Sequence, residues 1–233
     1  MTTAAKTETN LPVAYDEAAR GNNEMSSQDI VIPKINLMQP TSEQVNDGLA
    51  KFGDFINSLD NSIVCDDKGF EFLPFMMQKF HWVSKLKDAK SGDFKFDRTE
   101  AITCAADEQK PWDDCDPDGT PIKRTFVRRF YGMIAGTPVP VTIDAKGMSG
   151  NFAKKLATQM YVMNKAAKLP PCGKVVIIKA LKQKNAKGNY AIFDFAIGRN
   201  ATADEVSKCF EWFKTISAKP MAEEKEAQTS MNF

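Results

Sequence analysis

Ten lysines and no acidic residue lie in the stretch of chain between Asp144 and Asp194. Fixed positive charge at this density binds polyanions, because it displaces counterions from a phosphate backbone whatever the base sequence. The net charge of the whole chain is only +1, so the remaining sequence carries compensating acid. A nucleic acid is therefore the first expected partner. A solvated lysine face paired with the acidic first half of the chain is the alternative interpretation.

A second group of candidate contacts mixes cations with aromatic rings. In the run KRTFVRRFYG, which begins at Lys123, arginines alternate with aromatic residues. Sequence-independent binding of single strands needs cations that follow the backbone and rings on which bases stack. Amphipathic rings at half-exposed sites suit that stacking better than phenylalanine, which is more often in the core. The predicted single-strand contacts are Arg124, Arg128, Arg129, Tyr131, Lys146, Lys154, Lys155, Lys174, Lys179, Lys182, Lys184, Lys187, Tyr190 and Trp82.

Acidic and sulfur-containing residues offer little material for catalysis. The run DDCDPDG resembles the opening of a calcium loop, but Thr125 stands where a bidentate glutamate is needed. His81 is the single histidine, and the five cysteines include no CxxC pair. No phosphate loop, dinucleotide-binding turn or nucleophile elbow occurs. We predict no enzyme, no cofactor and no metal. The alternative is a metal-dependent nuclease that uses Asp113, Asp114, Asp116 and Asp118.

Composition places the chain among soluble globular proteins, with 42% apolar residues in 233. The first thirty residues lack the apolar run of a signal peptide, and the longest aliphatic run later is residues 175–178. An odd number of scattered cysteines argues against a disulfide framework. We expect a cytoplasmic protein that does not enter membranes.

Hydrophobic alternation predicts five main strands, near residues 70–83, 124–134, 139–145, 174–182 and 190–198. Pro74 predicts an edge or a bulge in the first strand. A polar insertion is expected near residues 84–121, and short strands or an extended wrap between Ile30 and Leu59. Residues 1–28 and 220–233 are too polar to fold alone, so we expect a flexible N-terminal arm and a flexible C-terminal tail.

Two helices are expected in the second half of the chain. Ser149 is the predicted cap of the first, whose apolar side recurs at helical spacing and which ends at a proline pair; the residues are Phe152, Leu156, Met160, Met163, Pro170 and Pro171. Thr202 and Glu205 form a capping box for the second. Its apolar face, expected to pack on the strands before Pro220 stops the helix, is Val206, Phe210, Phe213 and Ile216.

The order of these elements indicates the fold class. Three strands, a helix and a two-stranded hairpin follow the order of the OB-fold, a five-stranded, partly open barrel that binds oligonucleotides. We predict a mainly β protein with helices: an OB-fold-like barrel over residues 29–219, with a helix between strands 3 and 4 and an added C-terminal helix. Small α+β domains share this element order and remain an alternative.

The chain resembles the single-stranded DNA-binding proteins of bacteriophages over about residues 30–233. The resemblance rests on the strand KRTFVRRFYG, the lysine-bearing helix, the hairpin loop KQKNAKGNY and the tail EEKEAQTSMNF. It implies a protein of the host cytoplasm that coats single-stranded DNA during replication and recombination. It further implies a tail that recruits partner proteins through Glu223, Glu224, Glu226 and Phe233. Lys225 interrupts the acidic run of this tail, which departs from the family pattern.

Other partners and assemblies stay open at this point. A homo-oligomer is compatible with the interpretation. RNA remains possible because no residue pattern reads the 2′-hydroxyl. A virion-associated or protein-interaction module with a basic docking face is the non-enzymatic alternative.

Overall fold

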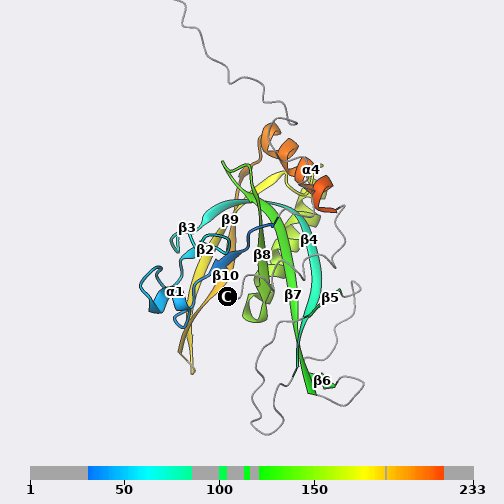
Figure 1. Ribbon diagram of the computed structural model, residues 1–233. Coiled ribbons are helices and arrows are strands. Elements are labelled where there is room, and N and C mark those ends of the chain that lie inside the picture. Colours follow the sequence, from blue (N-terminus) through cyan, green and yellow to red (C-terminus); the bar gives the residue numbers. More distant parts are fainter. Residues whose placement is uncertain (1–30, 86–99, 104–112, 116–120, 187, 218–233) are drawn as a thin grey trace, which may run out of the picture. The chain divides into compact units, whose positions relative to one another are not determined.

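The computed structural model describes residues 31–85, 100–103, 113–115, 121–186 and 188–217. The chain divides into two units, residues 1–31 and 32–233, and everything described here except Val31 belongs to the second. The predicted N-terminal arm and C-terminal tail lie outside the described residues. The second unit is mainly β with helices, as predicted, and consists of two antiparallel sheets (Figure 1). Over the described residues these sheets do not join into a closed barrel.

Seven strands form the large sheet, in the order β10-β9-β4-β7-β6, with β5 added to β4 and β8 added to β7. All five predicted strands are present, most of them longer than expected, and the predicted insertion contributes the two short strands β5 and β6. The bounds are β4 (Phe70–Lys85), β5 (Glu100–Thr103), β6 (Asp113–Cys115), β7 (Pro121–Ile134), β8 (Pro140–Lys146), β9 (Lys174–Asn185) and β10 (Gly188–Asn200).

Strand β4 is shared by two pairings and bends between them. Its first residues pair with β9, and the rest of the strand pairs with β7. The β4–β7 register shifts between Pro74 and Met76, which confirms the bulge expected at the proline. Gly69 permits the approach to β9, because a Cβ at this position would lie 1.8 Å from the carbonyl oxygen of Ile178. Its φ of +100° also favours glycine.

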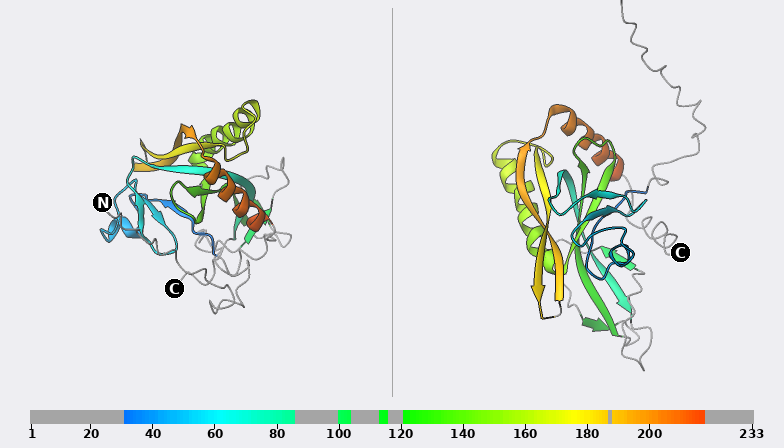
Figure 2. Two further views of the ribbon diagram at one scale, coloured as in Figure 1. Left: turned by 90° about the horizontal axis from the view of Figure 1, so that it is seen from above. Right: turned by 90° about the vertical axis from the view of Figure 1, so that its left-hand side faces the viewer.

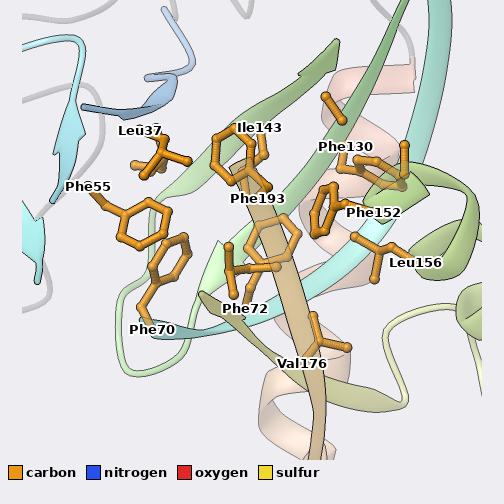
Figure 3. Close-up of a cluster of buried hydrophobic side chains, with 14 of the residues drawn as sticks. Leu37, Phe55, Phe70, Phe72, Phe130, Ile143, Phe152, Leu156, Val176 and Phe193 are labelled. Atoms are coloured by element: carbon orange, nitrogen blue, oxygen red, sulfur yellow. The ribbon is translucent and has the colours of Figure 1, made fainter. Parts of the chain in front are cut away.

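Phenylalanine rings fill the main core (Figure 3). The Phe55 ring meets Phe70 edge-on at 5.3 Å between centroids, and Phe152 lies 5.7 Å from Phe193 and 6.0 Å from Phe130. Each fully buried ring contributes roughly 2–3 kcal/mol relative to an exposed one. The phenylalanines of this core therefore stabilise the fold and are not presented to a ligand.

A three-stranded sheet, formed by β1 (Ile35–Leu37), β2 (Phe55–Asn57) and β3 (Ile63–Cys65), holds the N-terminal part against the large sheet. The short helix α1 (Glu43–Asn46) follows β1. Thr142 of β8 donates its backbone N–H to Pro33 at 2.8 Å. On the other side, the Gln39 side chain exchanges hydrogen bonds of 3.0 and 2.9 Å with the backbone of Ala191 in β10. The expected wrap is confirmed, and it runs between β8 and β10.

One helical segment connects β8 to β9, where a helix was predicted. It comprises η3 (Gly147–Ser149), α2 (Gly150–Thr158), a π-helical turn η4 (Gln159–Met163) and α3 (Asn164–Ala166). Phe152 and Leu156 are buried, as the helical spacing indicated. The expected Ser149 cap is wrong, since its hydroxyl accepts the backbone N–H of Phe193 at 3.3 Å and makes no capping hydrogen bond.

The last helix, α4 (Ala203–Ser217), begins at the predicted capping box. Thr202 donates its N–H to Glu205 at 2.8 Å, and Glu205 returns a 3.3 Å bond to the Thr202 hydroxyl. The predicted packing face is partly wrong: Ile216 is buried and Val206 half-buried, but Phe210 and Phe213 are 44% and 40% exposed. The helix instead turns a stripe of Cys209, Trp212 and Ile216 toward the sheet. No helix in the described part of the chain is long and apolar enough to cross a membrane.

Candidate nucleic-acid interface

Strand alternation divides the predicted contacts between two faces of the large sheet. We call the face that carries Phe72, Phe130, Ile143, Ile178 and Phe193 the inner face, because these side chains build the phenylalanine core. Successive residues of a strand point to opposite faces. Residues 126, 128 and 130 of β7 therefore share the inner face, and residues 127, 129 and 131 share the outer one.

Two hairpin ends extend the inner face beyond the core. One is the β4–β7 arm, residues 78–85 paired with residues 122–129, and the other is the β9–β10 arm, residues 182–185 paired with residues 188–191. Figures 1 and 2 show both arms running from the core toward the same side of the molecule.

On the β4–β7 arm a cation and an aromatic ring meet on the inner face. The guanidinium of Arg128 lies 4.5 Å from the centroid of Phe126, and both side chains are half-buried. Partial burial lowers the pKa of Arg128 from its ordinary value. Lys79 is directly opposite Arg128, and His81 is opposite Phe126 with its ring 5.4 Å away. The predicted pairing of a cation with a ring on one face is confirmed here.

On the β9–β10 arm, two lysines continue the inner face. Lys182 is opposite the buried Ala191, and the exposed Lys184 is opposite Asn189. The ammonium of Lys182 lies 2.7 Å from Asp67 and 5.4 Å from the centroid of Phe52. The hydrogen bond and charge of this lysine lower the pKa of Asp67. Lys182 is thus already paired, whereas Lys184 has no carboxylate within ion-pair distance among the residues described.

Two predicted contacts, Arg129 and Tyr131, are buried on the outer face. The Nε and Nη2 of Arg129 donate to the two carboxylate oxygens of Asp144 at 2.7 and 3.1 Å, and the two side chains are only 4% and 8% exposed. The Tyr131 hydroxyl donates to Gln78 Oε1 at 2.9 Å, and the residue is 1% exposed. Their assignment as ligand contacts must be corrected, because burial leaves neither side chain a surface to offer.

The remaining predicted contacts are distributed over several elements. Lys179 and Tyr190 lie away from the inner face, with Lys179 opposite Asp194 and the Tyr190 hydroxyl donating to Gln183 at 2.7 Å. The backbones of Trp82 and Arg124 lie in the β4–β7 pair, but their side chains are outside the described set, as are Lys187 and the tail residues Glu223, Glu224, Glu226 and Phe233. Four lysines lie elsewhere: the exposed Lys146, Lys154 and Lys155, and the half-buried Lys174.

A family model described as Pam3 phage gp34-like protein matches residues 5–224. The chain belongs to this family. The bacteriophage part of the resemblance is thereby supported, and the family description does not mention DNA. No curated protein and no solved structure matches the chain.

The sequence analysis did not single out Lys79, which lies opposite Arg128 on the inner face. Its position opposite Arg128 follows from the register after the Pro74–Met76 shift, which residue types alone do not reveal. For the nuclease alternative, Asp113 and Asp114 lie in β6, while Asp116 and Asp118 are outside the described residues. Within the described ranges, no three His, Cys, Asp or Glu side chains are grouped to hold a metal ion.

Proposed function

We propose that this phage-family protein binds single-stranded DNA without sequence preference and coats replication or recombination intermediates in the host cytoplasm. One observation carries the proposal: Arg128, stacked on Phe126, and Lys184 share the inner face of the sheet. Arg128 lies near the base of the β4–β7 arm, and Lys184 lies near the tip of the β9–β10 arm. Cations along the backbone and rings beneath the bases are the two requirements of such binding.

Strand pairing supports an OB-fold-like interpretation of the unit. Strand β4 is central, with β7 and β8 following on one side and β9 and β10 on the other, and a helical segment joins β8 to β9. This is the OB order, apart from the missing pairing of the third and fifth strands. Here Pro33, before β1, bonds to β8, and Gln39, after β1, bonds to β10. The two arms then correspond to the hairpins whose loops bind oligonucleotides in that fold.

Equilibrium binding to fluorescent oligo(dT), to a duplex of equal length and to the matching RNA, across a salt series, tests the proposal. We expect a preference for single-stranded DNA and a steep decline of affinity with salt. The inner-face variant is Arg128→Glu with Lys184→Glu, and Lys182 is left intact because Asp67 holds it. The salt slope should fall by about 0.7 for each lost phosphate contact.

A matched control reverses two exposed lysines of α4, Lys208→Glu with Lys214→Glu, at the same change of net charge. This control should bind DNA nearly as the unaltered protein does. Equal losses in both variants would mean that overall charge, and not the inner face, drives binding. No binding of any nucleic acid at low salt would reject the function and favour a basic docking module for an acidic protein. Magnesium-dependent cleavage of the oligonucleotide would favour the nuclease.

The C-terminal tail is proposed as a partner-binding segment that competes with DNA. Deleting residues 222–233 should leave DNA affinity unchanged or higher, while a replication or recombination protein is lost from pull-downs of phage-infected cells. Weaker DNA binding after the deletion would contradict this role.

A further inference from the structure

The helical segment between β8 and β9, together with the turn after it that holds Lys168, carries an exposed, positively charged face. We call this surface the helix face; its residues are Lys154, Lys155, Tyr161, Lys165 and Lys168. The opposite side of the segment is buried through Phe152, Ala153 and Leu156. Across the described residues, none of these four lysines has a carboxylate within ion-pair distance. Their charge is therefore available to an outside polyanion.

Tyr161 is the aromatic residue of this face, and it is 68% exposed. The ammonium of Lys165 lies 5.4 Å from its ring centroid. Tyr131 is buried and Tyr190 half-buried, so Tyr161 is the most exposed tyrosine among those described. An exposed ring accompanied by a cation can accept a base on its face while the cation holds a phosphate.

Tyr161 lies within the π-helical turn η4. Gln159 and Asn164 are five residues apart, which on a regular α-helix places them about 140° apart. Both are nevertheless buried, at 5% and 2% exposure, because the wide turn η4 brings them to the same side. Gln159 Nε2 and Asn164 Oδ1 have no hydrogen-bond partner within the described structure. An arrangement that leaves buried polar atoms unsatisfied is not optimised for stability alone, and π turns are frequent at functional sites.

We propose that the helix face is a second contact for single-stranded DNA, in which the four lysines hold phosphates and Tyr161 stacks on a base. The inference rests on the proposed function and extends it. Helix α2 contacts β8 and β10 and lies beside the β9–β10 pair in both views of Figure 2. A strand bound at the inner face thus continues onto the helix, and the occluded site is longer than the two arms alone cover. The helix face suits an acidic protein less well than DNA, because its exposed apolar side chains, Tyr161 and Val162, provide few anchors for a protein interface.

Oligonucleotide length separates the two contacts. A charge variant changes Lys154, Lys155, Lys165 and Lys168 to Gln, and a ring variant is Tyr161→Ala, with Tyr161→Phe as its control. Binding is measured to oligo(dT) of about 8 nucleotides, which fits one site, and of about 35 nucleotides, which exceeds the usual range for one OB-fold. The α4 pair Lys208→Gln with Lys214→Gln serves as a control that removes two positive charges outside the helix face.

We expect the charge variant to keep its affinity for the short oligonucleotide. For the long oligonucleotide, the slope of log affinity against log salt concentration should become shallower by about 0.7 for each phosphate contact removed. Tyr161→Ala should weaken long-oligonucleotide binding by about 5- to 100-fold, and Tyr161→Phe should retain it. Unchanged binding of the long oligonucleotide in both variants would overturn the inference while leaving the proposed function intact. Equal losses at both lengths would also overturn it, because the helix would then belong to the primary site. Failure of the unaltered protein to bind any nucleic acid would instead reject the proposed function, and this extension with it.

Discussion

Replacing Asp144 with asparagine should destabilise the protein strongly, because it removes a carboxylate charge that pairs with the buried guanidinium of Arg129. The Arg129–Asp144 pair is bidentate, at 2.7 and 3.1 Å, and both side chains are less than a tenth exposed. Removing one partner of a buried ion pair costs about 3–5 kcal/mol. Lys34, whose ammonium lies 3.7 Å from Asp144, also loses this contact, but at 26% exposure water can solvate it. We therefore expect the free energy of unfolding to fall by about 3 kcal/mol, the lower end of that range.

Urea unfolding followed by tryptophan fluorescence measures this loss. The double variant Arg129→Met with Asp144→Leu removes both charges and should recover most of the stability, since apolar replacements of a buried pair are often neutral. Asp67→Asn, which breaks the exposed pair with Lys182, is the control and should leave the unfolding midpoint nearly unchanged. A loss below about 1 kcal/mol in Asp144→Asn, or a double variant no more stable than the single one, would refute the reasoning.

The stability that is lost when Asp144 is replaced by asparagine should depend on pH, because it depends on the ionisation of Asp144. Burial opposes ionisation of Asp144, but the charge and hydrogen bonds of Arg129, aided by Lys34 and Lys146, hold its pKa below the usual 3.8. Because the folded pKa is the lower one, the stabilisation is complete above 3.8 and is lost as the pH falls through the folded pKa. The difference between the unaltered protein and Asp144→Asn should therefore shrink only in that acidic window. The double variant should still bind single-stranded DNA, because Arg129 is assigned to the core and not to the ligand.

Two substitutions and one chemical modification give further tests of the structure. Gly69→Ala should lower the melting temperature sharply, because its Cβ would lie 1.8 Å from a backbone oxygen; a normal melting curve would contradict this close approach. Thr202→Ala should lower the free energy of unfolding by about 1 kcal/mol through loss of the capping hydrogen bond, and Thr202→Ser should keep most of it. Burial, together with the charge of Asp66, raises the pKa of Cys65 to about 12, so its alkylation by iodoacetamide should be slow at neutral pH and rise with pH. Rapid reaction of Cys65 in the folded protein at neutral pH would contradict that shift.

Local patterns predicted the strands and the capping box because both depend on neighbouring residues. Alternation along β7, β9 and β10 and the Thr202–Glu205 spacing are read directly from the sequence. The β4–β7 register is not local, since the shift between Pro74 and Met76 decides which β4 side chains face Arg128. A slip of one residue exchanges the two faces of a strand. Lys79 was missed for this reason.

The local sequence pattern also could not predict which of the candidate contact residues are buried. Arg129 and Tyr131 look like surface contacts in the run KRTFVRRFYG, yet their partners Asp144 and Gln78 are 15 and 53 residues away. On α4, apolar residues fit two adjacent helical stripes, and helical spacing alone does not tell which of them faces the sheet. The sheet surface under the helix, formed by residues such as Leu73 and Met133, accepts the stripe of Cys209 instead.

The basic side chains in the described part of the chain differ in whether they already form an ion pair with a carboxylate. Arg129, Lys182 and Arg199 each have a carboxylate within 2.7 Å, provided by Asp144, Asp67 and Glu205 respectively. A phosphate that recruited one of them would have to break an existing ion pair, which offsets the gain from counterion release. Lys184 and the lysines of the helix face have no such partner among the residues described. The salt slope of DNA binding should therefore respond to substitution of these lysines and remain nearly constant when Arg199 is changed, although that change removes the tie between Glu71 of β4 and Glu205 of α4.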